Sequence, residues 1–220
     1  MKHLTQYITE KIKIDLSKDK YEYHPQTREE LDDIIYQLLQ ERGNEADLND
    51  IDISKIKDLQ SLFIPKIKKH NNRYPYNKEY DFSEFNGDIS DWDVSNVENM
   101  GWMFCSSKFT GDISNWKTSS VTNMKWMFND SEFNGDISDW DVSNVTNMCY
   151  MFNASKFTGK KCDLGKWDVS SVTNMNDMFS FCKFKGDLSN WKLNDKCMAA
   201  SIFYHCPMSR HKEWWPKNYK

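Results

Sequence analysis

The chain lacks a long hydrophobic run. Its most apolar stretch, residues 34–39, is far too short to span a membrane. Charged residues interrupt residues 1–14, which therefore lack the apolar core of a secretory signal peptide, and no cysteine precedes Cys105 to carry a lipid near the start. We expect a non-exported protein without membrane contact.

An excess of basic residues is also missing. The chain has 29 Lys and Arg against 33 Asp and Glu, a net charge of -4. Nucleic-acid binding depends on clustered cations that displace counterions from phosphates, so no nucleic acid is expected as a partner. Aromatic residues reach 15%, which argues against a wholly disordered chain.

The usual combinations of catalytic and metal-binding residues are absent from residues 85–203. All five histidines lie outside that segment: His3, His24, His70, His205 and His211. The cysteines form no CxxC pair and have no zinc-type spacing to histidine. We therefore expect free thiols, no catalytic residue, no metal, no cofactor and no enzymatic activity.

One sequence unit repeats along most of the chain. The segment Phe85–Met100 returns as Phe109–Met124 and again as Phe133–Met148. The period is 24 residues, except for one longer step with an insertion around residues 160–162. A weaker copy, residues 51–63, aligns with residues 92–104. Such a unit cannot bury its apolar face alone, so successive coils are expected to stack.

Two apolar periodicities alternate within each repeat. In the first copy, Trp92 and Val94 share one face of a predicted strand. Met100, Met103 and Phe104 then follow at helical spacing. The pattern predicts an α/β solenoid, a leucine-rich-repeat-like stack of short parallel strands and short helices, with an N-terminal helical cap.

The GDIS, WDVS, NM and MF motifs within residues 85–203 carry a family resemblance. This part of the chain resembles the bacterial surface protein A type, a leucine-rich-repeat-like family that includes mycoplasma lipoproteins. The resemblance implies a solenoid fold and a role in adhesion or protein interaction, with no enzymatic activity attached.

The flanks are predicted to close the stack. Thr27 and Glu30 form a capping box before an apolar stripe, and Gly43 ends that helix. An earlier amphipathic helix with Leu4 and Tyr7 either docks on the cap or binds a partner. The expected parts are an N-terminal helical cap at 1–46, a divergent first repeat at 47–64, a basic insertion loop at 65–84, the repeat solenoid at 85–203 and a C-terminal capping tail at 204–220.

Two polar rows follow the repeat. Side-chain amides of the first row are expected to bond the turns or helix starts: Asn99, Asn123, Asn147 and Asn174. Carboxylates of the second row either accept turn amides or share a cation, and we favour the turns: Asp88, Asp112, Asp136, Asp163 and Asp187.

Two further rows are candidates for binding. Trp102, Trp126 and Tyr150 occupy a predicted helix position that points away from the buried methionines, where they either form an interaction hot spot or pack on one another as core. The outward strand face carries alternating charges that are expected to pair: Asp93, Lys117 and Asp141 lead that row. We expect this face to be a solvent-exposed surface, and the alternative is that it docks a partner.

These features predict a non-enzymatic module for protein–protein interaction or adhesion, which presents a rigid repeat surface to an unidentified protein partner. The alternative is a structural component of a phage or mobile-element assembly that docks through its N-terminal helix. The expected location is cytoplasmic or virion-associated, and the oligomeric state is left open.

Overall fold

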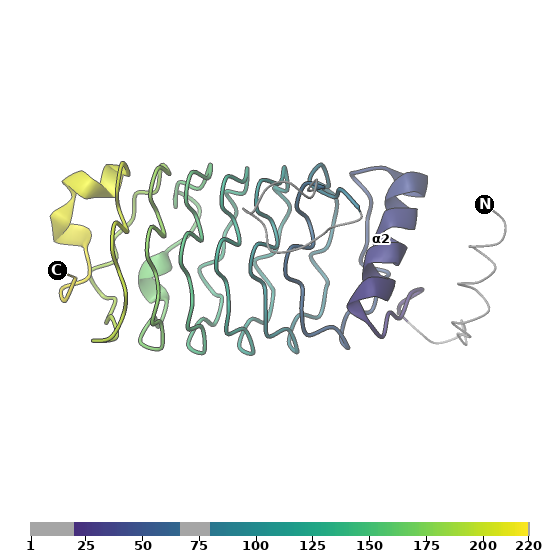
Figure 1. Ribbon diagram of the computed structural model, residues 1–220, viewed down its shortest axis with the longest axis horizontal. Helices are drawn as coiled ribbons and strands as arrows, with labels where there is room; N and C mark the ends of the chain where they lie inside the picture. The colour runs from purple at the N-terminus through teal and green to yellow at the C-terminus, as the bar shows by residue number, and fades with distance from the viewer. Residues whose placement is uncertain (1–19, 67–79, 220) are drawn as a thin grey trace.

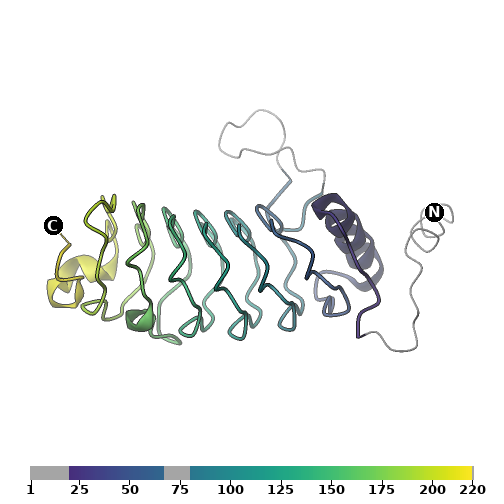
Figure 2. The same cartoon turned by 90° about the horizontal axis from the view of Figure 1, so that it is seen from below.

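The computed structural model describes residues 20–66 and 80–219. Successive coils stack along one axis (Figure 1), and the view from below shows the same succession (Figure 2). Helix α2 (Arg28–Arg42) lies at one end of the stack, and the 3-10 helices η2 (Pro207–Arg210) and η3 (Lys212–Trp214) lie at the other. A third 3-10 helix, η1 (Leu164–Lys166), belongs to the repeat with the insertion. None of the helices in these ranges has the length and apolar character of a membrane span.

The predicted α/β solenoid, with its leucine-rich-repeat-like stack of short parallel strands and short helices, is wrong. The described residues contain one α-helix, three short 3-10 helices and no strand. Neighbouring coils are joined by isolated parallel bridges, for example between Asn99 and Asn123 and between Asn123 and Asn147. The coils therefore stack without forming a sheet.

Turns replace the predicted strands. Trp92 donates its backbone N–H to the carbonyl of Ile89, and Val97 donates to that of Val94. These N–H groups close turns within one coil, so they do not bond to the next coil. A chain that turns repeatedly can also bury apolar residues spaced two or three positions apart. The alternation of apolar and polar residues therefore did not distinguish these turns from a strand.

Turns also replace the predicted helices. Met100, Met103 and Phe104 are fully buried, as their helical spacing predicted. Met103, however, donates to the Met100 carbonyl at 3.2 Å, and Trp102 between them has a φ of 63°. A left-handed residue cannot continue a right-handed helix, so the segment forms a turn instead.

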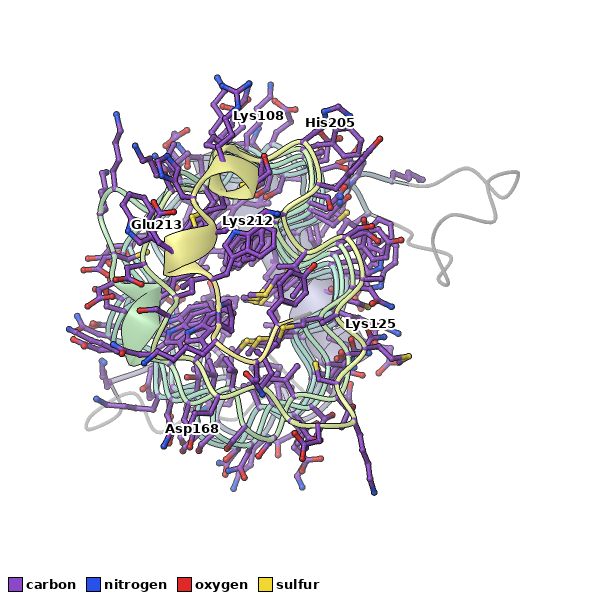
Figure 3. The ribbon with its side chains drawn as sticks, turned by 90° about the vertical axis from the view of Figure 1, so that its left-hand side faces the viewer. Lys108, Lys125, Asp168, His205, Lys212 and Glu213 are labelled. Atoms are coloured by element: carbon purple, nitrogen blue, oxygen red, sulfur yellow. The ribbon has the colours of Figure 1, made fainter. Side chains whose placement is uncertain are left out.

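Stacked rings form the centre of the core. Phe104, Phe128 and Phe152 lie in successive coils, with 5.6 Å between the centroids of each neighbouring pair. Viewed from the C-terminal end, the side chains of successive coils overlie one another (Figure 3). Like residues therefore pack on like residues, as the repeat predicted.

The repeat tryptophans join each coil to the one before. Trp116 Nε1 donates to the carbonyl of Ile89 at 3.1 Å, and Trp140 Nε1 donates to that of Ile113 at 3.0 Å. Both indoles are 3% exposed. A buried indole N–H needs an acceptor, and here the preceding coil provides it.

Helix α2 has the predicted caps. The Thr27 side chain accepts the Glu30 N–H at 3.2 Å, while the Glu30 carboxylate accepts the Gln26 N–H at 2.7 Å. Gly43, with a φ of 82°, follows the last helical residue. The predicted apolar stripe is buried: Leu31, Ile34, Ile35, Leu38 and Leu39.

Some predictions concern residues outside the described ranges. The N-terminal amphipathic helix with Leu4, Tyr7, Ile8 and Ile12 lies there, as does most of the basic insertion loop at 65–84. The boundaries of the five predicted parts stay predictions.

Candidate interaction surface

One side of the coil stack consists of a row of turns, which we call the turn ladder. Every second N–H in it donates to a carbonyl of the next coil: Trp102 donates to Lys125 and Phe104 to Met127, both at 2.9 Å. The N–H groups that bond to the next coil thus point toward the C-terminal end of the stack, and the carbonyls that accept them point toward the N-terminal end. The segments are residues 58–63, 99–106, 123–130, 147–154, 174–181 and 198–205.

Left-handed residues recur at fixed places in the turn ladder, and none of them is glycine. The first such position is held by Ser61, Trp102, Trp126, Tyr150, Asp177 and Ser201. The second is held by Ser106, Asp130, Ala154, Phe181 and His205. Glycine, Asn and Asp tolerate a positive φ best, and a bulky residue is unusual there. The positive φ at the first position therefore does not explain why aromatic residues occupy it in three coils.

Trp102, Trp126 and Tyr150 form a continuous stack, here called the aromatic row. The Trp102 and Trp126 rings are 4.4 Å apart and 2° from parallel, and the Trp126 and Tyr150 rings are 4.4 Å apart at 22°. Trp102 is 6% exposed and packs with Ile64 and Cys105, whereas Trp126 and Tyr150 are half-buried. The structure thus brings the three predicted residues together, in turns rather than on a helix.

Asp177 ends the aromatic row at the same position of the next coil. Burial, and then a hydrogen bond to the Asp177 carboxylate, raise the pKa of the Tyr150 hydroxyl. The hydroxyl therefore stays protonated at neutral pH and orients the Tyr150 ring against the following coil.

The predicted charged row lies in a different segment of each coil. Asp93, Lys117 and Asp141 are all exposed. The Asp93 carboxylate accepts the Ser95 N–H at 3.1 Å, and that of Asp141 accepts the Ser143 N–H at 3.0 Å. Among the ion pairs of residues 20–66 and 80–219, none joins Lys117 to either carboxylate. Both aspartates therefore shape turns, and the expected pairing with Lys117 is not found.

The Gly-Asp row caps turns, as favoured from the sequence. Asp88 accepts the Ser90 N–H at 2.9 Å, and Asp136 accepts the Ser138 N–H at the same distance. The backbone hydrogen bond from Ser90 lowers the pKa of Asp88, and the Ser138 hydroxyl is the main cause of the lowered pKa of Asp136. Each carboxylate is thus held ionised by its own turn.

The side chains of the asparagine row accept N–H groups of their own turns, and the first two also bond to each other. Asn123 Nδ2 donates to Asn99 Oδ1 at 2.8 Å, and Asn99 Oδ1 also accepts the Gly101 N–H at 3.0 Å. The prediction that these amides bond the turns is confirmed.

The six cysteines are free thiols. Burial raises the pKa of Cys182, whereas a hydrogen bond with Cys182 lowers the pKa of Cys206. Burial raises the pKa of Cys162 to about 11 and also raises that of Cys149 and Cys197. A thiol that stays protonated is a poor nucleophile and a poor metal ligand. No group of three or more His, Cys, Asp or Glu side chains that could hold a metal occurs in the part of the chain that the structure describes.

The left-handed turns are the feature that the sequence pattern did not reveal. A signal for them was present, because Ser61, Asp177 and Ser201 hold the position of Trp102 in other coils. Small polar residues are typical of turns and unusual in the middle of a helix.

Comparison with known families finds one match for the repeats. Residues 72–191 and 160–212 match the model of a family described as Mycoplasma protein of unknown function, DUF285. Searches of curated proteins and of solved structures find no match. The family match spans more than half of the chain and covers the aromatic row and every segment of the turn ladder after residues 58–63. The protein is thus a member of this mycoplasma family.

Proposed function

We propose that this protein is a non-enzymatic protein–protein interaction module and that the aromatic row is its contact surface. The proposal depends most on one observation, the left-handed backbone of Trp102, Trp126 and Tyr150. Holding a bulky residue in this region costs on the order of 1–3 kcal/mol, and such strain is concentrated at functional sites. Asp177 and Ser201 occupy the same position in other coils, so folding does not require an aromatic ring there.

The stacking favours a protein partner over a sugar or a nucleobase. Ring faces are the surfaces on which sugars and bases stack, but in the aromatic row the faces of Trp126 cover those of its two neighbours. Ring edges are left to contact a partner. Partly exposed aromatic side chains, here those of Trp126 and Tyr150, are typical of protein interaction surfaces.

The motifs of the repeat add a finer family assignment to this proposal. We propose that the GDIS, WDVS and NM motifs make these coils repeats of the bacterial surface protein A type. A role in adhesion would follow from the same surface.

The test is a double substitution taken from the chain itself. The variant W126D/Y150D places at both positions the residue that Asp177 already provides, so the left-handed backbone is retained. We expect quantitative pull-down from a mycoplasma lysate to lose the bound partner, while the melting temperature changes by less than about 5 °C, as for a loss near 1 kcal/mol.

Tyr36→Asp is the matched control, because Tyr36 is an aromatic residue of α2 that is 40% exposed. This variant should keep the partner. Retention of the partner by W126D/Y150D, or a collapse of its stability with no other change, would assign the aromatic row to the core.

A further inference from the structure

The last coil ends in a row of backbone N–H groups for which the described part of the chain offers no acceptor. In the coil before it, Asp177 donates to the Ala200 carbonyl at 2.9 Å and Phe179 donates to Ile202 at 3.0 Å. The equivalent groups of the last coil have no hydrogen-bond acceptor among the described residues: these are the N–H groups of Ala199, Ser201, Phe203 and His205. The turn ladder therefore ends in donors alone.

The opposite end of the turn ladder is capped. Arg28 of α2 donates through Nη1 to the carbonyls of Asp58 and Gln60, at 3.3 and 2.8 Å. These carbonyls are the ones that a preceding coil would have bonded. Because α2 covers the acceptor end, a second copy of this chain cannot extend the stack head to tail by the same hydrogen bonds.

The surroundings of the donor row are cationic. A cavity of about 430 Å³ beside it is lined by Lys185, His205, Arg210 and His211, among others, and by no carboxylate. Lys185 lies over the Trp214 ring at 5.5 Å, and neither Lys185 nor Arg210 forms an ion pair with a described residue. Lys185 and Arg210 thus give this end two positive charges that no carboxylate in the described ranges pairs with.

Apolar side chains lie exposed along the same coil edge. Phe181, Met198 and Tyr204 are 56%, 55% and 53% exposed, more than any other large hydrophobic side chain described. The His205 ring stacks on Phe181 with 5.1 Å between centroids. In the end view, η3 with Glu213 lies on one side and His205 lies on the other (Figure 3), while the tail rings of Trp215 and Tyr219 pack against Phe203.

We propose that the C-terminal end of the turn ladder binds an extended acidic segment of a partner polypeptide, which adds to the stack as a further coil edge. Backbone carbonyls of that segment accept the N–H groups of Ala199, Ser201, Phe203 and His205, as in the addition of a peptide to an open edge. Its carboxylates lie toward Lys185 and Arg210, because the cavity offers positive charge and no negative charge. This site is separate from the aromatic row and depends on different residues.

A synthetic peptide tests the proposal directly. The probe is a short acetylated peptide of alternating Glu and Val, labelled with fluorescein and titrated with the full chain. We expect its anisotropy to rise and the amide NMR signals of residues 199–205 to shift and become protected from hydrogen exchange. K185E/R210E should weaken binding by roughly tenfold or more, because truncating or reversing charge partners at an interface has effects of that size.

The matched control is K55E/K117E, which changes the net charge equally at two exposed lysines of early coils, away from the last coil. It should bind the peptide as the unmodified chain does, and a peptide of alternating Lys and Val should not bind. Absence of acidic-peptide binding, equal losses in both double variants, or protection of residues 199–205 by dimerisation alone would each overturn the proposal. W126D/Y150D should bind the peptide normally, so failure here is distinct from failure of the aromatic row.

Discussion

At the residue scale, polar atoms inside an apolar stack join the coils. Trp140 Nε1 donates to the Ile113 carbonyl at 3.0 Å, and Trp167 makes the same bond to Ile137 at 3.1 Å. Each ring buries apolar surface while its N–H binds the preceding coil. An indole thus provides both the packing and the register that an aliphatic residue could not.

Trp140→Phe should separate these two contributions. The variant retains an aromatic ring but loses the Nε1 donor and part of the buried volume, so we expect the free energy of unfolding to fall by about 1–3 kcal/mol. Urea unfolding followed by circular dichroism measures it. Trp126→Phe, at a half-buried ring, should cost less, and an unchanged midpoint for Trp140→Phe would contradict the role of the indole bond.

Several residue roles could be predicted from the sequence. Apolar columns, the Asn99 and Asn123 ladder and the Asp88 turn follow from their place in the repeat, because a repeated residue meets its own copy in the next coil. The conformation of Trp102 could not be predicted, because its φ is set by the turn and by packing against Ile64 rather than by its own preference.

At the element scale, one element follows strongly from the sequence and the others do not. Helix α2 has caps, a full apolar stripe and four turns' length in which to show them. Each coil segment is only a few residues long, and at that length a turn and a short helix share the same i, i+3 spacing. The spacing of Met100 and Met103 therefore predicted their burial correctly, but the predicted helix was wrong.

Helix α2 also protects the acceptor end of the turn ladder, and Arg28→Ala should expose it. Without the guanidinium, the carbonyls of Asp58 and Gln60 lose their donor, so we expect a loss of about 1–3 kcal/mol in unfolding free energy. Hydrogen–deuterium exchange should speed up first in residues 58–63. Glu29→Ala, at an exposed position of the same helix, serves as the control. If hydrogen exchange of residues 58–63 is unchanged in Arg28→Ala, α2 covers the first coil without capping its carbonyls.

At the scale of the whole molecule, the hydrogen bonds give the stack a direction. N–H donors of the turn ladder point toward the last coil and carbonyls point toward α2, so the two ends have different chemistry. The sequence predicted that coils stack in register, since the period is uniform. It did not predict the polarity, because the direction of a backbone hydrogen bond depends on the turn conformation and not on side-chain type.

The central claim is that one repeat equals one coil, with like residues over like residues. Its most direct test compares two internal deletions by urea unfolding. Removal of residues 123–146 joins Thr122 to Asn147, which restores the order of the repeat, so the protein should keep one cooperative transition at moderately lower stability. Removal of residues 123–134 alone should abolish that single transition, because the coil left with half a repeat cannot lie in register over both of its neighbours. If both deletions unfold alike, the coil register described here is contradicted.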